Sequence, residues 1–250
     1  MNLPLTDAEC ERYHRQIILP NWGKEGQKKV KEAVVFIAGA GGLGSPVSIY
    51  LAAAGVGKLR ICDDGEPELS NLNRQILHTD GDIGKNKTFS ARETLEKVNP
   101  HVRVESLPTR IVRESVGDLV GDAVIIVDCM DNFPTRHILN EYAVKKRIPF
   151  VHGGVSGMCG QITFIQSPET PCLHCIFPGS PPREVFPVVG ATPGVIGTLE
   201  ALEVLKFITG IGENLKGRLL IWDGERMIFE QVHVNNDPLC PVCGHEKSGG

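Results

Sequence analysis

The chain has 250 residues, of which 41% are hydrophobic and 22% charged, as in ordinary soluble globular proteins. The net charge of −4 leaves no basic excess to neutralise phosphates, which argues against a general nucleic-acid or membrane-surface binder. Residues 1–30 show no secretory signal pattern, and no apolar run reaches the roughly 18 residues of a membrane span. We therefore expect a cytoplasmic protein whose eight cysteines are reduced or metal-bound.

Strands and helices are predicted to alternate over residues 1–152. Strands are expected where short apolar runs occur, at residues 34–39, 58–63, 102–104, 123–128 and 148–152. Helices are expected at residues 8–15, 27–31, 43–54, 85–98 and 133–147. Thr6 or Asp7 would cap the first helix, and Asn132 the last. This alternation predicts an α/β protein with a Rossmann-like, doubly wound and mostly parallel sheet.

The pattern changes after residue 153. A strand is expected at residues 161–166, and a proline-rich stretch covers residues 168–193. A helix follows, and its inner face is expected to carry Val195, Leu199, Leu202 and Leu205. Residues 219–222 and 227–234 predict an antiparallel hairpin with an Asp223-Gly224 turn. The sheet should therefore end in an antiparallel C-terminal extension.

Gly39, Gly41 and Gly44 follow the first predicted strand with the G-x-G-x-x-G spacing. Glycines are needed there for a tight turn, for approach of backbone N–H groups to phosphate, and for helix packing on the strand. Asp63 ends the second strand roughly 20 residues on, where a carboxylate can accept a ribose hydroxyl. The pattern predicts a nucleotide site and leaves NAD and ATP open.

Two C-x-x-C pairs are far apart in the chain: Cys172 with Cys175, and Cys240 with Cys243. Four thiolates form a closed tetrahedral zinc site, which is structural. An iron–sulfur cluster needs the same number of ligands but usually takes more closely spaced cysteines. We therefore predict a structural zinc site that joins the proline-rich stretch to the C-terminal tail.

Two further cysteines, Cys62 and Cys129, lie in or beside apolar strands and are expected to be inert core residues.

Several charged residues decide between ATP and NAD, because hydride transfer needs no cluster of cations around the phosphates. Arg74 and Lys87 follow the second strand, whose carboxyl end borders the ligand crevice. Arg15 has no visible link to this edge, and each cation taken singly can be a solvated surface charge. Asp128 and Asp131 follow the strand at residues 123–128. A carboxylate there is either a magnesium ligand or an acid at a helix N-terminus.

Five features occur in order along the chain: residues 12–16 (RYHRQ), 39–44 (GAGGLG), 69–75 (LSNLNRQ) and 128–132 (DCMDN), and the two C-x-x-C pairs. With them the chain resembles, from about residue 11 to residue 244, the ThiF/MoeB/HesA family, the bacterial relatives of ubiquitin-activating enzymes. Together the five features are far more specific than the glycine spacing alone.

The resemblance implies an adenylyltransferase that acts on a small ubiquitin-like sulfur-carrier protein ending in Gly-Gly. The glycine carboxylate of the carrier would attack the α-phosphate of ATP, giving an acyl-adenylate and pyrophosphate. Family members are homodimers, and the sequence contains no rhodanese domain, so a separate sulfur donor protein is expected. The pathway would be molybdopterin or thiamine biosynthesis.

The resemblance also assigns roles by matching position. Gly42, with the other loop glycines, would lie against the nucleotide, and Asp63 would hold the ribose. Asp131 would bind magnesium, and Arg15 would reach the phosphates of the partner subunit. The remaining residues assigned to the nucleotide site are Asn71, Arg74, Gln75, Lys87 and Asn132. The expected catalytic residues are Arg15, Arg74, Lys87 and Asp131.

The expected organisation is one ThiF-type domain over residues 1–250. It would comprise a helical preface (1–31), a nucleotide-binding half (32–153) and a carrier- and zinc-binding half (154–250).

The sequence departs from the family pattern at three places. Residues 181–190 hold no cysteine where thiamine-pathway members carry one, so no covalent thioester or persulfide step is expected there, which favours the molybdopterin-type member. Met130 stands where close relatives usually carry threonine. Residues 248–250 end in Gly-Gly, which we interpret as a flexible tail. Two alternatives stay open: an NAD(P)-dependent oxidoreductase, and a non-catalytic carrier-binding scaffold.

Overall fold

The computed structural model describes residues 4–179 and 186–244. Within them one eight-stranded sheet forms, in the spatial order β3 (Arg103–Leu107), β2 (Lys58–Cys62), β1 (Val34–Ala38), β4 (Ile125–Asp128), β5 (Phe150–Ser156), β6 (Cys159–Ile165), β7 (Arg218–Asp223) and β8 (Ile228–His233). Neighbours from β3 to β5 pair in parallel, and neighbours from β5 to β8 pair antiparallel. The predicted mostly parallel Rossmann-like sheet with an antiparallel extension is confirmed.

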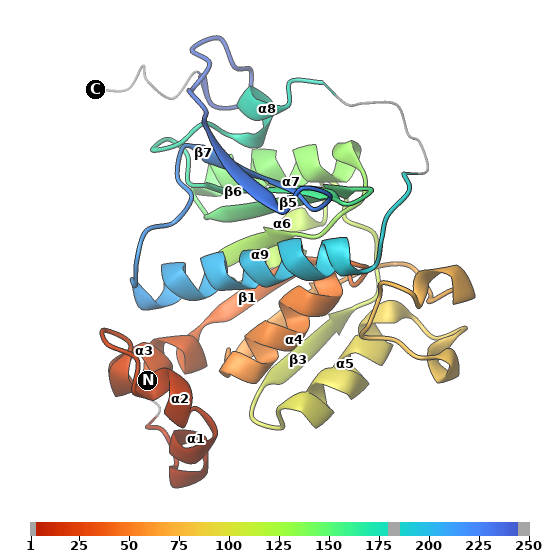
Figure 1. Cartoon of the computed structure of the whole chain (residues 1–250), viewed down its shortest axis with the longest axis vertical. Helices are drawn as coiled ribbons and strands as arrows, with labels where there is room; N and C mark the ends of the chain where they lie inside the picture. Colours follow the sequence, from red (N-terminus) through yellow and green to blue (C-terminus); the bar gives the residue numbers. More distant parts are fainter. Residues whose placement is uncertain (1–3, 180–185, 245–250) are drawn as a thin grey trace.

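Helices cover both faces of the sheet (Figure 1). One face packs on α4 (Gly44–Ala54), α5 (Lys87–Val98) and α9 (Ala191–Thr209), and the other on α6 (Val116–Val120), α7 (Phe133–Lys146) and α8 (Leu173–Ile176). At one corner lie α1 (Asp7–Arg12), α2 (His14–Ile17) and α3 (Gly23–Glu32). Thr6 caps α1 with a reciprocal capping box to Glu9. Over the described ranges, the helices are too short or too polar to cross a membrane.

The central strands explain why the apolar runs are continuous. All of β4 is buried, and β1 is buried except for the partly exposed Val34. Strands covered by helices on both faces have no solvent side, so alternation of apolar and polar residues disappears. The core therefore lies on both faces of β1 and β4, and their carboxyl ends emerge together at one edge.

The predicted inner face of α9 is correct at three of its four positions. Val195, Leu199 and Leu205 are partly buried and pack against the main core, whereas Leu202 is 52% exposed. The buried positions of α9 mix apolar, small and polar residues, among them Ile196, Gly197, Glu200, Ala201 and Val204. Gly197 permits the close crossing of α9 over α4, because a Cβ there would lie 2.6 Å from Pro46 Cγ and 2.7 Å from the Leu43 carbonyl oxygen.

The predicted hairpin of β7 and β8 is confirmed, but its turn is longer than a two-residue Asp-Gly connection. Asp223 pairs with Ile228, so the loop between them runs from Gly224 to Met227. The Asp223 carboxylate accepts backbone hydrogen bonds from Glu225 (3.0 Å) and Arg226 (3.1 Å), which stabilises the longer turn.

Two glycines of α9 offer a matched test of this packing. Gly197→Ala should lower the free energy of unfolding by about 1–3 kcal/mol, because the new methyl group collides with α4. Gly194→Ala should instead stabilise by about 0.5–1 kcal/mol, since nothing lies within 4 Å of its Cβ position. Urea unfolding of both variants checks the pair, and equal effects would contradict the crossing geometry.

Candidate functional site

The glycine turn, residues 39–44, lies where the strand order reverses between β1 and β4. Ligands of doubly wound sheets bind in the crevice outside the carboxyl ends at this point. Gly39 has φ +100°, and a Cβ there would lie 2.8 Å from the Cys129 carbonyl oxygen. A Cβ on Gly44 would collide with the Gly39 carbonyl oxygen. Within the described residues no side chain caps α4, but the Ser45 N–H already donates to the Gly41 carbonyl oxygen at 3.0 Å and Pro46 has no N–H. Of the first three residues of α4, Gly44 therefore has the N–H that is available to an anion.

Asp63 and His78 hold the glycine turn from two sides. The Asp63 carboxylate accepts hydrogen bonds from the Ala40 and Gly65 N–H groups, both at 2.8 Å. His78 Nε2 lies 2.9 Å from the Ala40 carbonyl oxygen and therefore donates, while Nδ1 lies 2.7 Å from Ser90 Oγ. Burial lowers the pKa of His78, which keeps the ring neutral. The sequence interpretation missed His78.

Arg74 and Gln75 lie over the glycine turn. Arg74 Cγ lies 3.6 Å from where a Cβ on Gly42 would stand, and Gln75 Nε2 lies 3.6 Å from the same position on Gly41. The Arg74 guanidinium donates to the Ser70 carbonyl oxygen at 2.8 Å, so its own loop orients it. A cation and an amide thus border the uncapped start of α4.

Asn71 belongs to the same loop. Its side chain accepts a hydrogen bond from the Glu68 N–H at 3.3 Å, within a short 3₁₀ turn (Leu69–Asn71). The predicted nucleotide ligand Asn71 therefore also holds the turn that carries Arg74.

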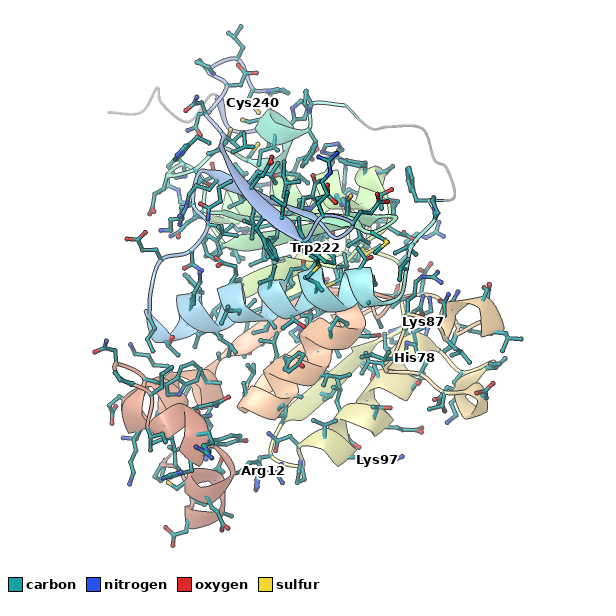
Figure 2. The ribbon with its side chains drawn as sticks, in the orientation of Figure 1. Arg12, His78, Lys87, Lys97, Trp222 and Cys240 are labelled. Atoms are coloured by element: carbon teal, nitrogen blue, oxygen red, sulfur yellow. The ribbon has the colours of Figure 1, made fainter. Side chains whose placement is uncertain are left out.

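Lys87 begins α5 at this edge of the sheet. Asn86 caps the helix by accepting a hydrogen bond from the Thr88 N–H at 2.9 Å. Lys87 Nζ lies 3.6 Å from the Cβ position of Gly65, in the turn that follows Asp63. Figure 2 shows Lys87 and His78 at the same end of α5, with Lys97 at its opposite end.

Asp131 lies in the loop after β4, next to the glycine turn. Met130 Sδ lies 3.5 Å from the Cβ position of Gly39, so this loop touches the turn directly. Asn132 accepts a hydrogen bond from the Thr135 N–H at 3.0 Å and caps α7, as predicted. Asp128 is fully buried, whereas Asp131 is exposed, so Asp131 is the carboxylate of this pair that can meet a solvated ion.

Arg15 does not reach the glycine turn of its own chain. Gln16 donates to the Ala54 carbonyl oxygen at 3.1 Å, and a Cβ on Gly55 would lie 2.5 Å from Tyr13. These contacts place α2 at the C-terminal end of α4, and the glycine turn lies at the other end, roughly 16 Å along the helix. The side chain of Arg15 is exposed to solvent.

A buried polar cluster lies behind the loop that carries Asp131. It consists of Asp128, Arg136, His152 and Glu200. His152 Nδ1 lies 2.7 Å from Asp128 Oδ2, and Arg136 Nε lies 3.4 Å from the same oxygen. The Glu200 carboxyl lies against the backbone of Gly153, where a Cβ would be 2.6 Å from Oε1.

Sequence reasoning missed three members of this cluster. Glu200 could have been found, because it repeats at i and i+4 with Ile196 and Val204 on the buried face of α9. His152 interrupts an apolar strand, which is a weaker signal. No sequence pattern marks Arg136, because its role depends on the packing of α7 against β4 and β5.

The four cysteines of the C-x-x-C pairs come together as predicted. Their Sγ atoms lie within 4.8 Å of one another, with separations of 3.4 Å (Cys175–Cys243), 3.7 Å (Cys172–Cys240) and 3.9 Å (Cys172–Cys175). A tetrahedral ion with Zn–S distances of about 2.3 Å requires separations of roughly 3.8 Å. The donor set and its geometry therefore fit zinc.

Cys62 and Cys129 are buried, as expected for inert core residues. Burial raises the pKa of Cys62 to about 12 and that of Cys129 well above its ordinary value, so neither is a thiolate at neutral pH. Residues 180–185, within the crossover stretch, and the Gly-Gly tail lie outside the described residues.

A glycine turn at the switch point of a doubly wound sheet, joined to an uncapped helix, defines a nucleotide-binding α/β protein. The profile of the ThiF family matches residues 13–242. The chain belongs to the ThiF family.

Its similarity to known proteins extends over nearly the whole sequence. A sulfur carrier protein adenylyltransferase of Thermus thermophilus is 42% identical over 252 residues, covering 96% of this chain and 93% of the relative. The SAMP-activating enzyme E1 of Haloferax volcanii is 41% identical over 250 residues, covering 98% and 92%. Among solved structures, E. coli MccB with ATP has a TM-score of 0.83 at 26% identity, covering 96% of this chain and 75% of that one.

Zinc content tests the cysteine site. Purified protein should carry about one zinc ion per chain, and Cys240→Ser should lose most of it and melt at a lower temperature. Cys159→Ser, at an exposed cysteine, should keep both the metal and the melting temperature. Elemental analysis with thermal melts checks this, and equal metal content in the two variants would contradict the four-thiolate site.

Glu200 should make stability depend on pH. Burial raises the pKa of Glu200 well above its ordinary 4.5, so ionisation costs stability as pH rises above 4.5. Glu200→Gln should therefore gain stability over the parent protein, with a larger gain at pH 8 than at pH 5. Glu203→Gln should instead lose stability, because the Glu203 carboxylate accepts hydrogen bonds from Asn214 (2.8 Å) and Leu215 (2.9 Å) and pairs with Lys206. Urea unfolding at both pH values measures this, and a pH-independent difference for Glu200→Gln speaks against a neutral carboxyl.

Proposed function

We propose that this chain is an adenylyltransferase that uses ATP to activate the C-terminal glycine carboxylate of a small ubiquitin-like sulfur-carrier protein. The observation that supports the proposal most directly is that three segments meet around the glycine turn: Arg74 Cγ lies 3.6 Å from the Cβ position of Gly42, Lys87 Nζ lies 3.6 Å from that of Gly65, and the loop of Asp131 touches Gly39 through Met130. Family membership supports the same activity, since relatives are named as sulfur carrier protein adenylyltransferase and as an activating enzyme E1. Two cations beside a phosphate-binding turn fit a triphosphate better than a dinucleotide.

In the proposed reaction, a carboxylate oxygen of the carrier attacks the α-phosphorus of ATP. The bond from the α-phosphorus to the bridging oxygen breaks, and pyrophosphate leaves with the electron pair. Arg74 and Lys87 would neutralise charge that moves onto the pyrophosphate, while the N–H groups of the glycine turn hold the nucleotide. Asp131, with Asn132 beside it, would hold a magnesium ion, which supplies further neutralisation of phosphate charge. Asp63 would accept the ribose hydroxyl.

Arg15 enters this proposal through a second copy of the chain. Its exposed side chain lies at the end of α4 remote from the glycine turn, so it can serve a partner's site in a homodimer. The carrier would then receive sulfur from a separate donor protein, in molybdopterin or thiamine biosynthesis. Zinc held by the four cysteines would be structural, joining residues 154–179 to the C-terminal segment of the carrier-binding half.

Exchange of labelled pyrophosphate into ATP, with a carrier ending in Gly-Gly, tests the function. Lys87→Met and Asp131→Asn should each lower the exchange rate about 10²–10³-fold, because each removes charge aimed at the phosphates. Lys97→Met, at the far end of α5, and Asp122→Asn, at the opposite end of the β4 region, should retain it.

A carrier without its last glycine should give no exchange. Exchange that ignores the carrier terminus, or equal rates in Asp131→Asn and Asp122→Asn, contradicts the proposal. Binding of NADH in place of Mg-ATP would favour an oxidoreductase, and carrier binding without any exchange would favour a scaffold.

A further inference from the structure

The buried polar cluster contains one permanent cation and two carboxyl groups. Arg136 Nε lies 3.4 Å from Asp128 Oδ2, and burial raises the pKa of Glu200 well above its ordinary value. A neutral Glu200 leaves Asp128 as the ionised partner of Arg136, since a buried charge needs a counter-ion. Burial also lowers the pKa of His152, so the neutral ring donates its Nδ1–H to Asp128 at 2.7 Å.

This arrangement holds both the N–H and the carbonyl group of the Met130 backbone. Its N–H donates to Asp128 Oδ1 at 3.1 Å, and its carbonyl oxygen accepts from Arg136 Nη2. The same Nη2 donates to the Gly153 carbonyl oxygen at 3.1 Å, which ties the loop to β5. On the other side of Asp131, Asn132 is fixed as the cap of α7. Asp131 is therefore an exposed residue between two fixed neighbours.

His152 belongs to β5, whereas Asp128 ends β4 and Arg136 lies on α7. The side chain of His152 is fully buried, and its ring lies 5.6 Å from that of Phe177. The Nδ1–H of His152 and the guanidinium of Arg136 converge on Asp128 Oδ2, so a donor from β5 decides where the Asp128 carboxylate points.

We propose that His152 is a positioning residue for the adenylation site: by holding Asp128 it fixes Arg136 and the Met130 backbone, and so the direction of the Asp131 carboxylate. The inference rests on the proposed function, which gives Asp131 its role toward the metal and nucleotide. Partners behind a metal-binding carboxylate typically change metal affinity or activity 10–100-fold when removed.

Two substitutions at position 152 separate the hydrogen bond from the packing. His152→Phe keeps a ring against Phe177 but removes the donor to Asp128. His152→Asn restores an N–H near the position of Nδ1. Calorimetry of ATP binding over a range of magnesium concentrations gives the half-saturating magnesium concentration. It should rise about 10-fold or more in His152→Phe and return most of the way in His152→Asn.

Thr163→Val provides the matched control. Thr163 pairs with His152 in the register of β5 and β6, is buried, and donates to the Arg218 carbonyl oxygen at 2.9 Å. Loss of this hydroxyl should lower the melting temperature without moving the magnesium dependence, because it donates to Arg218 and not to Asp128, Arg136 or the backbone of Met130.

A His152→Phe protein with the magnesium dependence of Thr163→Val overturns the positioning role, as does a failure of His152→Asn to differ from His152→Phe. The proposed function fails separately: wild-type protein would then bind Mg-ATP yet show no carrier-dependent exchange. In that case the shift in the half-saturating magnesium concentration still tests whether His152 positions the Asp131 carboxylate.

Discussion

The structure depends on a close backbone approach between the ends of β1 and β4. Gly39 leaves β1 with a positive φ, and the Cys129 carbonyl stands where any side chain on Gly39 would have to go. A Cβ on Gly44 would likewise collide with the Gly39 carbonyl oxygen, so a glycine at this position lets α4 begin close to the strand ends. This contact brings the loop of Asp131 against the turn that would hold phosphates, at the switch point where doubly wound sheets bind ligands.

The charged side chains around the glycine turn come from loops and from the start of α5, and buried side chains hold these segments in place. Asp63 and His78 hold the glycine turn, and the cluster of Asp128, Arg136 and His152 holds the loop of Asp131. Groups that must neutralise a moving phosphate charge work best when they need not reorganise, and such supports provide this rigidity. The four-cysteine site lies elsewhere, between residues 172–175 and 240–243, and joins two distant segments of the chain.

Much of this architecture could be predicted from local patterns. Continuous apolar runs indicated strands buried on both faces, the glycine spacing indicated the turn, and paired C-x-x-C motifs indicated the metal site. The inner face of α9 was predicted only in part: Leu202 is exposed, and the buried Gly197 and Glu200 were missed because apolar size does not reveal a close helix crossing. His152 and Arg136 could not be assigned, since their roles arise only when β5 and α7 meet Asp128. Arg15 would act only through a second chain.

We propose that the residues around the glycine turn break ATP between its α- and β-phosphates. The most direct measurement is a single-turnover quench with ATP labelled on the α-phosphate and a Gly-Gly carrier. The label should appear on the carrier as an acid-stable acyl-adenylate, with one pyrophosphate released per adenylate formed. Release of inorganic phosphate and labelled ADP, with an unlabelled carrier, would contradict the account.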